Sequence, residues 1–560
     1  MKKLFYAIAA LIAAGFVSTA ATRSPKSAVA RNIDVFNSVM KELQTNYVDS
    51  IDVEASVRTA IDAMLETLDP YTEYIPRDKR DDFNSQNNGE YAGIGAIIVQ
   101  RDGGVYIEEP YAGSPSAKAG LKPGDLIVAI DGDTMLSKPN TTVSERLRGA
   151  PGSTIKVTVK RPYTSDSILV LDVTREKIRI PSVPYFGTVA PGIGYIALTQ
   201  FTDKSADEVK TALKTLMDTV ELKGLVFDLR DNGGGYLESA VKILSYFLPK
   251  DTEVLRTRGK GILNERVYKT TSKPIAPDLP LVVLTDGNTA SASEITSGAL
   301  QDLDRAVIMG SRTFGKGLVQ TTRDLPYDGL LKVTVAKYYI PSGRLIQAID
   351  YSHRNPDGTP GRIPDSLTTA FTTASGRVVR DGGGITPDVE VTYPEVSRVT
   401  FNVVRDNWAS DYATRFAATH PSIAPAGQFE ITDSIFEDFK NFIDPAKFQR
   451  DKVLETIIDR LRQAAQIEGY MTDSLSTQID HLASMMKKPL DEELDANRAT
   501  ISPYLARAIV ERYYYQAGGI ENALRTDPGV DSAVTVLSDP ARYHKLLAPA
   551  PDNTKTPGKK

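Results

Sequence analysis

Apolar side chains recur at helical spacing near both ends of the chain. Residues 33–43 carry them every three or four positions, and residues 50–68 repeat the pattern, which predicts two amphipathic helices. The second helix is expected to end before Pro70, because proline disfavours the helical conformation in the residue that precedes it. Residues 400–545 show the same periodicity over a longer stretch. The pattern therefore predicts a helical region near each end of the chain, on either side of a middle part that does not show this helical periodicity.

The middle of the chain consists of shorter apolar runs bounded by turn-forming residues. Residues 88–177 predict a small β-rich module. Residues 185–345 alternate between strand-like and helix-like segments, which is typical of an α/β unit. The expected strands are 195–201, 225–229, 279–284, 307–310 and 332–340, and the expected helices are 206–220, 237–247 and 291–300. Residues 351–382 are polar and predict an excursion over the surface.

Composition narrows the classes of function. A chain of 560 residues is long enough for several domains. Its net charge of −5 argues against a nucleic-acid partner, because such binders usually present a strongly basic face. The absence of cysteine excludes disulfides, thiolate metal sites, a cysteine nucleophile and a lipid-modified cysteine. The sequence offers no cluster of metal ligands and no nucleotide-binding loop, so we expect neither a metal nor a cofactor.

The first residues have the pattern of an export signal. Two lysines precede an apolar run over residues 4–17, and small residues follow at 18–21. We expect residues 1–21 to be a cleaved signal peptide of a periplasmic or cell-envelope protein. The run is short for a membrane span, but an uncleaved N-terminal anchor and a buried first helix remain as alternatives. Residues 547–560 are rich in proline and lysine and are expected to be disordered.

Ser291 and Lys316 are the candidate reactive residues. Ser291 follows the apolar run 279–284 and opens a helix, so it is expected to lie among unpaired N–H groups at the positive end of the helix dipole. This position suits a reaction that forms an oxyanion. The histidines at 353, 420, 481 and 544 all lie outside this segment. Lys316 is therefore the candidate base, since serine–lysine pairs are an established variant of the nucleophile–base pair.

The lysine needs particular surroundings to act as a base. Near neutral pH its pKa must fall by roughly three units from about 10.4. Leu318 and Val319 offer apolar surroundings for Lys316. If this segment is extended, Lys316 and Gln320 lie on the same face, so Gln320 is the candidate that orients the amine.

Three glycines at 233–235 follow the expected strand 225–229 and precede a helix. A phosphate cradle is disfavoured, because the spacing is not Gly-x-Gly-x-x-Gly and no Gly-Lys-Ser/Thr follows. A tight structural turn and a loop that offers N–H groups to an oxyanion both remain open.

The β-rich module resembles a PDZ domain. The most specific stretch is AGLKPGDLI over residues 119–127, preceded by a glycine-bearing turn and a strand at 91–98. The resemblance implies that a peptide is added as a strand to the sheet edge and that a backbone nest holds its C-terminal carboxylate. By the same resemblance, the nest would be formed by Gly93, Ile94 and Gly95.

Five segments carry a wider resemblance over residues 32–395. They are LDPYT (68–72), DLRDNGGG (228–235), TASASEI (289–295), FGKGLVQ (314–320) and YIPSG (339–343). In this order and with a PDZ-like insert, the chain resembles the C-terminal processing peptidases, also called tail-specific proteases, which use a serine–lysine dyad. The resemblance implies that this chain cleaves proteins and needs no cofactor.

The resemblance also implies a role for individual residues. Ser291, rather than Ser293, would be the nucleophile, Lys316 the base and Gln320 the supporting residue. The oxyanion hole would be formed by Gly234 and Ala292, and an arginine in the PDZ region, here Arg148, would couple substrate arrival to activity. The family usually has proline where this chain has Gly233, which adds backbone freedom next to the expected oxyanion hole.

The expected architecture is multi-domain, with an α/β peptidase core, an inserted PDZ domain, an N-terminal helical region and a C-terminal helical domain. The expected bounds are 1–21 for the signal peptide, 30–87 for the helical region, 88–177 for the PDZ domain, 178–398 for the core, 399–546 for the C-terminal helical domain and 547–560 for the tail.

The expected function is that of an exported serine endopeptidase acting on proteins with free, unstructured C-terminal tails. A catalytically silent PDZ scaffold of the cell envelope and an acyl-CoA-type hydrolase are the alternatives. A homodimer through the helical regions and an activating or adaptor protein are left open.

Overall fold

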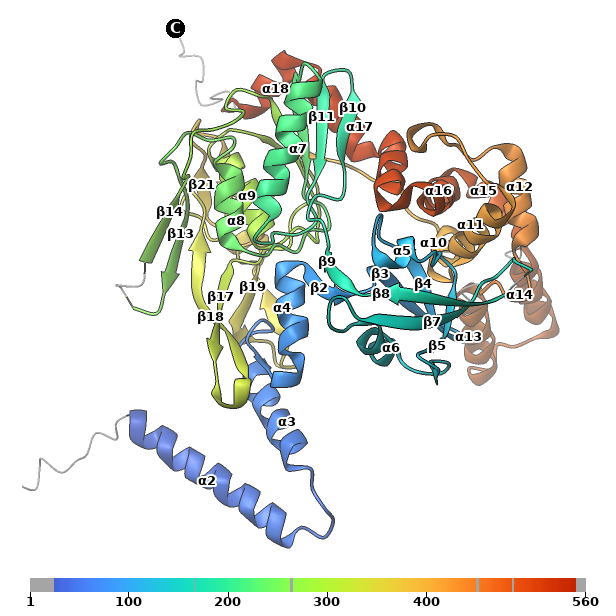
Figure 1. Ribbon diagram of the computed structural model, residues 1–560, viewed down its shortest axis with the longest axis horizontal. Helices are drawn as coiled ribbons and strands as arrows, with labels where there is room; N and C mark the ends of the chain where they lie inside the picture. Colours follow the sequence, from blue (N-terminus) through green and yellow to red (C-terminus); the bar gives the residue numbers. More distant parts are fainter. Residues whose placement is uncertain (1–24, 166, 262–264, 450–452, 486–487, 550–560) are drawn as a thin grey trace, which may run out of the picture. The chain divides into compact units, whose positions relative to one another are not determined.

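The computed structural model describes residues 25–165, 167–261, 265–449, 453–485 and 488–549 (Figure 1). The expected signal peptide and most of the expected disordered tail lie outside these ranges. The chain divides into two compact units, one formed by residues 1–77 with 320–334 and the other by residues 78–319 with 335–560.

The first unit contains both predicted N-terminal helices. Helix α2 spans Pro25–Asn46 and helix α3 spans Val53–Glu66, where the Asp52 carboxylate accepts the N–H of Ala55 as an N-cap. Strand β1 (Glu73–Ile75) follows and pairs antiparallel with β18 (Leu330–Tyr339). The N-terminal helices are thus tied to a strand that lies far along the chain.

Within the second unit, the β-rich module forms the predicted PDZ fold. The sheet has the order β3 (Ala96–Arg101), β4 (Gly104–Pro110), β5 (Leu126–Ile130), β7 (Thr154–Lys160) and β8 (Ile168–Thr174), with β6 (Asp133–Thr134) beside β5. Two helices complete it, α5 (Pro115–Lys118) and α6 (Asn140–Leu147). Strands β2 (Glu90–Gly93) and β9 (Glu176–Arg179) pair antiparallel where the chain enters and leaves the module.

The core of the second unit is a six-stranded sheet with helices on both faces. Its order is β10 (Phe186–Ala190), β11 (Ile193–Ala197), β12 (Gly224–Asp228), β15 (Leu281–Thr285), β16 (Val307–Gly310) and β23 (Val389–Glu390). All neighbours are parallel except β10 and β11. One face is covered by α7 (Ser205–Thr219), α8 (Leu237–Leu244) and α9 (Ala292–Asp302).

The second face of this sheet is covered by two helices near the C-terminus, α17 (Pro528–Leu537) and α18 (Pro540–Leu547). Neighbouring residues of one strand point to opposite faces, so that Val226 belongs to the hydrophobic cluster that contains Val530 of α17, while Phe227 belongs to the cluster under the other helix layer. In Figure 1 the red α17 and α18 therefore lie with the green core. Part of the C-terminal helical region is structurally a layer of the α/β core.

The polar stretch 351–382 forms two small hairpins rather than a structureless loop. They are β19 (Ile349–Arg354) with β20 (Pro360–Arg362) and β21 (Ala370–Thr372) with β22 (Val378–Arg380). Arg377 anchors the second hairpin by donating to Asp304 (2.7 Å) and Asp388 (2.6 Å). A further hairpin of β13 (Glu253–Gly259) and β14 (Glu265–Lys269) was not expected from the apolar pattern.

The C-terminal helical region has a hydrophobic core of its own, built on aromatic residues such as Tyr412, Phe436 and Phe439. Its helices are α10 (Arg398–Arg405), α11 (Trp408–Thr419), α12 (Asp433–Phe442), α13 (Val453–Ile467), α14 (Asp473–Met485), α15 (Leu490–Ala496) and α16 (Arg498–Ala523). No helix in the described ranges is both long and apolar enough to span a bilayer.

Candidate active site

Ser291 lies in a strained turn between strand β15 and helix α9. Its backbone angles are φ 56° and ψ −114°, which a residue with a side chain rarely adopts and which costs on the order of 1–3 kcal/mol. The turn places Ser291 immediately before the first helical residue, Ala292. Among the described residues, no acceptor is found for the Ala292 N–H, as expected for the first turn of a helix. A hydroxyl and an unpaired N–H therefore adjoin at one helix start.

Glu294 joins the turn of Ser291 to the loop of Lys316. Its buried carboxylate accepts the backbone N–H groups of Ser291 (2.9 Å) and Lys316 (2.8 Å). It also accepts the Gly315 N–H (2.8 Å) and the Thr313 hydroxyl (2.5 Å). Burial raises the pKa of Glu294 to about 7, against the opposing effect of these hydrogen bonds. One carboxylate thus fixes both predicted reactive residues through their backbones.

Tyr338 provides a second connection between the same two segments. Its buried hydroxyl donates to the Lys316 carbonyl (2.7 Å) and lies 3.2 Å from the Ser291 carbonyl. The Lys316 loop also needs its preceding glycine, because a Cβ at Gly315 would lie 2.3 Å from the Cβ of Ala348. The lysine is therefore held in a well-defined loop and is half-buried.

The glycine loop packs directly on the serine turn. Gly234 has φ +98°, and a Cβ there would lie 2.8 Å from the Ser291 Cβ and 2.8 Å from the Ala292 N. The structure thus brings Gly234 and Ala292 together beside Ser291. In this arrangement the Gly234 N–H donates to the Asn232 side-chain oxygen (2.9 Å). The assignment of Gly234 as an oxyanion donor stays a prediction, and it requires this N–H to leave Asn232.

Asn232 fastens the glycine loop to the serine turn. Its backbone carbonyl accepts the Ala290 N–H (3.0 Å) and the Ser293 hydroxyl (2.8 Å), and its side-chain amide donates to the Leu198 carbonyl (2.7 Å). The Ser293 hydroxyl is thus engaged in the loop, whereas Ser291 lies at the turn itself. The side chain of Asn232 is completely buried.

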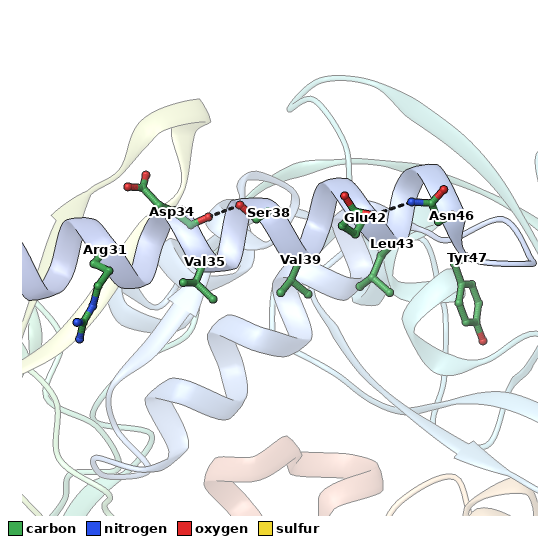
Figure 2. Close-up of a pocket in the computed structure, with 9 residues that line it drawn as sticks. All are labelled: Arg31, Asp34, Val35, Ser38, Val39, Glu42, Leu43, Asn46 and Tyr47. Carbon is green, nitrogen blue, oxygen red and sulfur yellow. Dashed lines mark hydrogen bonds between the residues drawn. The ribbon is translucent and has the colours of Figure 1, made fainter.

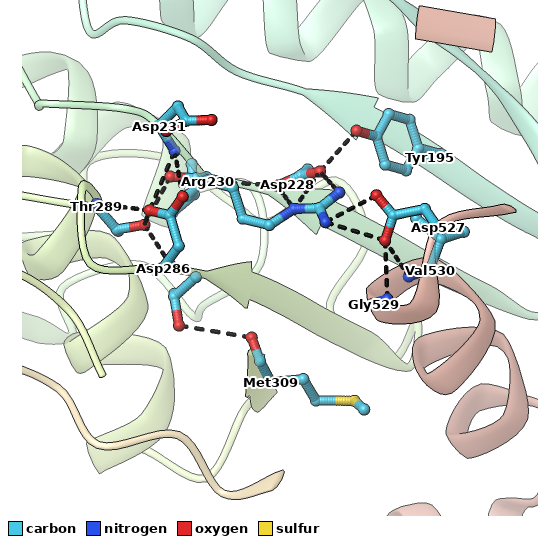
Figure 3. A network of polar contacts seen from close by, with 12 residues as sticks. Tyr195, Asp228, Arg230, Asp231, Asp286, Thr289, Met309, Asp527, Gly529 and Val530 are labelled. Carbon is cyan, nitrogen blue, oxygen red and sulfur yellow. Dashed lines mark hydrogen bonds and ion pairs between the residues drawn. The ribbon is translucent and has the colours of Figure 1, made fainter. Parts of the chain in front are cut away.

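A polar network surrounds Arg230 and Asp231, which directly precede this loop in the sequence (Figure 3). Asp286 accepts the Asp231 N–H (3.1 Å) and the Thr289 N–H (2.9 Å), which joins the glycine loop to the serine turn again. Arg230 pairs with Asp228 (2.5 Å) and with Asp527 at the start of α17 (2.8 Å). The C-terminal layer of the core is therefore connected to the segment that carries the glycines.

Gln320 lies on strand β17 (Leu318–Asp324), in the first compact unit. Its side-chain amide donates to the Thr334 hydroxyl (3.1 Å) on β18. Strand β17 begins at Leu318, two residues after Lys316, so Lys316 itself lies before the strand that carries Gln320. The role of Gln320 beside the lysine stays a prediction.

The PDZ module contains a groove of about 260 Å³. Its lining includes Tyr91, Ile94, Ile97, Tyr111, Leu147 and Arg148. Burial raises the pKa of Tyr91 to about 12, so its hydroxyl stays neutral. Gly95 is at φ +74°, and a Cβ there would lie 2.6 Å from the Ser114 Cβ, so the glycine turn that follows Gly93 and Ile94 needs glycine at this position.

Arg148 connects this groove to the rest of the second unit. Its guanidinium forms an ion pair with Asp82 of α4 (Arg80–Asn88) and lies 5.5 Å from the centre of the Tyr91 ring. The predicted coupling residue is thus found at the rim of the groove, in contact with a helix outside the PDZ sheet.

A larger hollow of about 660 Å³ lies along α2, and its lining contains one serine, Ser38, and no lysine or histidine that could act as its base. Figure 2 shows Val35, Val39 and Leu43 projecting from one side of this helix. Among the described residues, no group of three or more histidine, aspartate or glutamate side chains is placed to hold a metal ion. The polar groups suited to acyl transfer are those around Ser291.

Glu294 is a site residue that the sequence pattern does not single out. The signal was present, because a serine followed three residues later by glutamate at a helix start is the pattern of a capping box. The Glu294 carboxylate does accept the Ser291 N–H as this motif requires, and it adds the contacts to the lysine loop that the pattern does not predict.

Comparisons with known proteins place these features in one family. Residues 192–355 match the model of peptidase family S41, residues 106–161 that of a PDZ domain, and residues 399–537 that of a probable PDZ-protease C-terminal helical domain. A carboxy-terminal-processing protease of Bartonella bacilliformis is 35% identical over 317 residues, which cover 56% of this chain and 72% of that protein.

Two further relatives extend the comparison. The carboxy-terminal processing protease CtpB of Bacillus subtilis is 33% identical over 329 residues, which cover 58% of this chain and 68% of that protein. A solved photosystem II D1 C-terminal processing protease matches 64% of this chain and 86% of its own, with 28% identity and a TM-score of 0.35. The predicted family and fold class are confirmed: the chain belongs to peptidase family S41 and is a serine peptidase of the C-terminal processing type with a PDZ domain.

Proposed function

We propose that the protein is an exported endopeptidase that cuts other proteins near their C-termini, with Ser291 as nucleophile and Lys316 as general base. One observation carries the assignment of these two residues: the Glu294 carboxylate binds the backbone N–H groups of both, at 2.9 and 2.8 Å. This contact supports a site in which nucleophile and base are held together by a buried group.

The reaction follows from this arrangement. Neutral Lys316 takes the proton of the Ser291 hydroxyl while the serine oxygen attacks the carbonyl carbon of the peptide bond. Backbone N–H groups stabilise the charge that develops on the carbonyl oxygen. Ala292 supplies one, and Gly234 supplies a second after leaving the Asn232 side chain. Protonated Lys316 then protonates the leaving amine, and water hydrolyses the acyl-enzyme.

The PDZ domain selects the substrate in this scheme. An unstructured C-terminal tail lies as an added strand in the groove, and the turn formed by Gly93, Ile94 and Gly95 binds its carboxylate. The apolar and aromatic lining of the groove supports a preference for an apolar last residue. The contact of Arg148 with Asp82 of α4 supports its role in coupling tail binding in the groove to catalytic activity.

Export and self-association belong to the same proposal. Export rests on the signal pattern of residues 1–21. Self-association rests on α2, where Ile33, Phe36 and Leu43 remain exposed at helical spacing, with exposed fractions of 53%, 41% and 39%. Light scattering on wild type and on Ile33→Ser/Phe36→Ser tests the dimer, which the double variant is expected to dissociate.

The decisive experiment compares purified residues 22–560 as wild type, Ser291→Ala and Lys316→Ala. The substrate is an unstructured protein with an apolar C-terminus, offered with and without its last residues. We expect each substitution to lower cleavage by at least about 10³-fold, and removal of the tail to slow the wild type. Ser297→Ala is the matched control on the same helix, since its hydroxyl donates to the Ser293 carbonyl within that helix. Tail binding without wild-type cleavage would favour the silent scaffold instead.

A further inference from the structure

The PDZ domain contacts the C-terminal helical domain through its β3–β4 hairpin. Arg101 at the end of β3 donates to Asp411 of α11 (2.7 Å) and to Ser410 (3.2 Å). The Glu109 carboxylate on β4 accepts the backbone N–H of Gln516 on α16 (2.6 Å). The proposed proteolytic mechanism uses none of these contacts.

The contact at Gln516 coincides with a break in α16. Tyr515 has φ 56° and ψ −170°, a conformation outside the helical region and costly for a residue with a side chain. The helix restarts at Gln516, whose N–H would lack a partner at such a restart. A carboxylate at this position is favoured by the helix dipole. A residue of the PDZ domain therefore caps a helix of another domain.

The surrounding contact is polar and close. Ser410 of α11 donates to the Glu108 carboxylate of β4 (3.3 Å), and Arg512 of α16 holds Ser410 from within the helical domain by donating to its hydroxyl (2.8 Å). A Cβ at Gly124 of the PDZ domain would lie 2.6 Å from the Thr414 methyl group of α11. Interfaces of this polar kind between domains of one chain resemble transient protein–protein contacts, for which relative motion is the default expectation.

Glu109 is poorly compensated in its position. Burial, and to a lesser extent the nearby Glu511, raise its pKa to about 7. The groups that oppose this shift are the Gln516 N–H, Arg512 and Arg507, all on α16, while Tyr111 faces it from its own domain. The Glu109 carboxylate is thus stabilised by one hydrogen bond and two arginines but lies beside the like charge of Glu511. We expect the free energy needed to break this contact to be small.

The same hairpin lines the peptide groove. Glu109 pairs in register with Ile97 of β3, and Ile97 and Tyr111 both line the groove. A bound tail and the C-terminal helical domain therefore act on adjacent residues of one hairpin.

We propose that α11 and α16 form a releasable latch for the PDZ domain, closed through Arg101 and Glu109, and that a C-terminal tail in the groove opens it. The inference rests on the proposed function, because it takes the PDZ groove as the site of tail capture. By linkage, a closed latch weakens tail binding and an open latch strengthens it. The C-terminal helical domain then lowers the apparent affinity of the PDZ groove for tails, so that only tightly binding tails open the latch.

The absence of cysteine in this chain permits a clean test. A Cβ at Gly124 would lie 3.4 Å from the Thr414 Cβ, close to the roughly 3.5–4.5 Å found in disulfides, so Gly124→Cys with Thr414→Cys should lock the latch closed. Each single cysteine variant, treated identically, is the control. Because Gly124 is at φ +88°, Glu109→Ala is added as a variant that needs no residue in that conformation.

The readout is the affinity of a fluorescein-labelled peptide with a free apolar C-terminus, measured by anisotropy in the Ser291→Ala background. We expect the oxidised double variant to bind at least about 10-fold more weakly than its reduced form, and Glu109→Ala to bind roughly 5-fold more tightly than the parent. Equal affinities, within about 2-fold, for the oxidised and reduced forms would overturn the latch.

The same variants with Ser291 intact are assayed for cleavage. A parent protein that binds the peptide but cleaves nothing would refute the proteolytic function while leaving the binding test of the latch valid.

Discussion

Glu294 in the peptidase core and Glu109 in the PDZ domain are two carboxylates with the same raised pKa of about 7 and opposite surroundings. Glu294 is completely buried and accepts four hydrogen bonds from two segments of the core. Glu109 accepts one backbone N–H from a broken helix and lies beside Glu511. The number of donors, rather than the pKa, distinguishes a group that builds a rigid site from one suited to a movable contact.

Removing the Glu294 carboxylate should have the largest effect. Glu294→Ala leaves three backbone N–H groups and the Thr313 hydroxyl without their acceptor, and each unsatisfied buried donor costs about 1–3 kcal/mol. We expect a loss of about 3–5 kcal/mol in the free energy of unfolding and at least about 100-fold in kcat. Urea unfolding and steady-state cleavage measure the two effects.

Glu238→Gln, at an exposed glutamate in the first turn of α8, is the control for this substitution and should change stability by under about 0.5 kcal/mol. Wild-type stability in Glu294→Ala would show that the four contacts contribute nothing net, and the comparison between the two carboxylates would then fail.

The glycine loop offers a second test within the rigid region. Gly234→Ala places a Cβ 2.7 Å from the Ala290 carbonyl oxygen and 2.8 Å from the Ala292 N, at a positive φ, so the loop must move away from Ser291. We expect kcat to fall by roughly 10²-fold with little change in tail affinity.

Gly233→Ala is the matched neighbour, because a Cβ at Gly233 meets nothing within 4 Å. It should stay within about 3-fold of wild type. Similar losses in both variants would indicate that loop flexibility, not the packing of Gly234 on Ser291, sets the rate.

The latch should respond to pH through Glu109. Its pKa rises from 4.5 to about 7 in the docked state, so docking takes up a proton and is strongest below pH 4.5. Docking weakens as the pH rises to about 7 and stays constant above it, and tail affinity should rise over the same window by up to about tenfold. Anisotropy titrations from pH 5 to 8 measure this change.

Glu109→Gln keeps the shape of the side chain and cannot ionise. Its tail affinity should be independent of pH and close to the low-pH value of the wild type. If the tail affinity of the wild type does not change with pH, ionisation of Glu109 does not control tail binding.

The smallest effect is expected from Arg507, which lies one helical turn from Glu511 and forms an ion pair with it (2.8 Å). Arg507→Gln removes a charge that lowers the pKa of Glu109, so the midpoint of the pH dependence should move upward by less than about one unit. A downward shift would contradict the assignment of that midpoint to Glu109.

Local patterns in the sequence predicted a large part of this fold. The helices of the N-terminal region and the strands that frame Ser291 follow from apolar spacing within short windows. Ser291 and Lys316 were identified from neighbouring residues and from a family resemblance. These features depend on contacts close in sequence or on motifs of a few residues.

The remaining features depend on contacts between distant segments. The packing of α17 on the second face of the sheet places Val530 and Val226 in one hydrophobic cluster, and the periodicity of a helix does not predict which face of a sheet it covers. The break at Tyr515 has a local signal in Gly518 and Gly519, where a Cβ would lie within 2.5 Å of Tyr514 or Glu511. The cap at the restart comes from Glu109, which is distant in sequence, so no local pattern predicts it. The hairpin β13–β14 was missed because its strand β14 is largely exposed.

The covering of the core sheet by α17 and α18 has a consequence for biosynthesis. The strands from β11 to β16 leave the ribosome well before residues 528–547, so one apolar face of the sheet lacks its permanent cover while the helical region is still being translated. Asp527, which pairs with Arg230 next to the glycine loop, arrives with the same late segment. The support of the Ser291 turn is therefore complete only once residues 527–547 have been translated, and we expect shorter nascent chains to lack it.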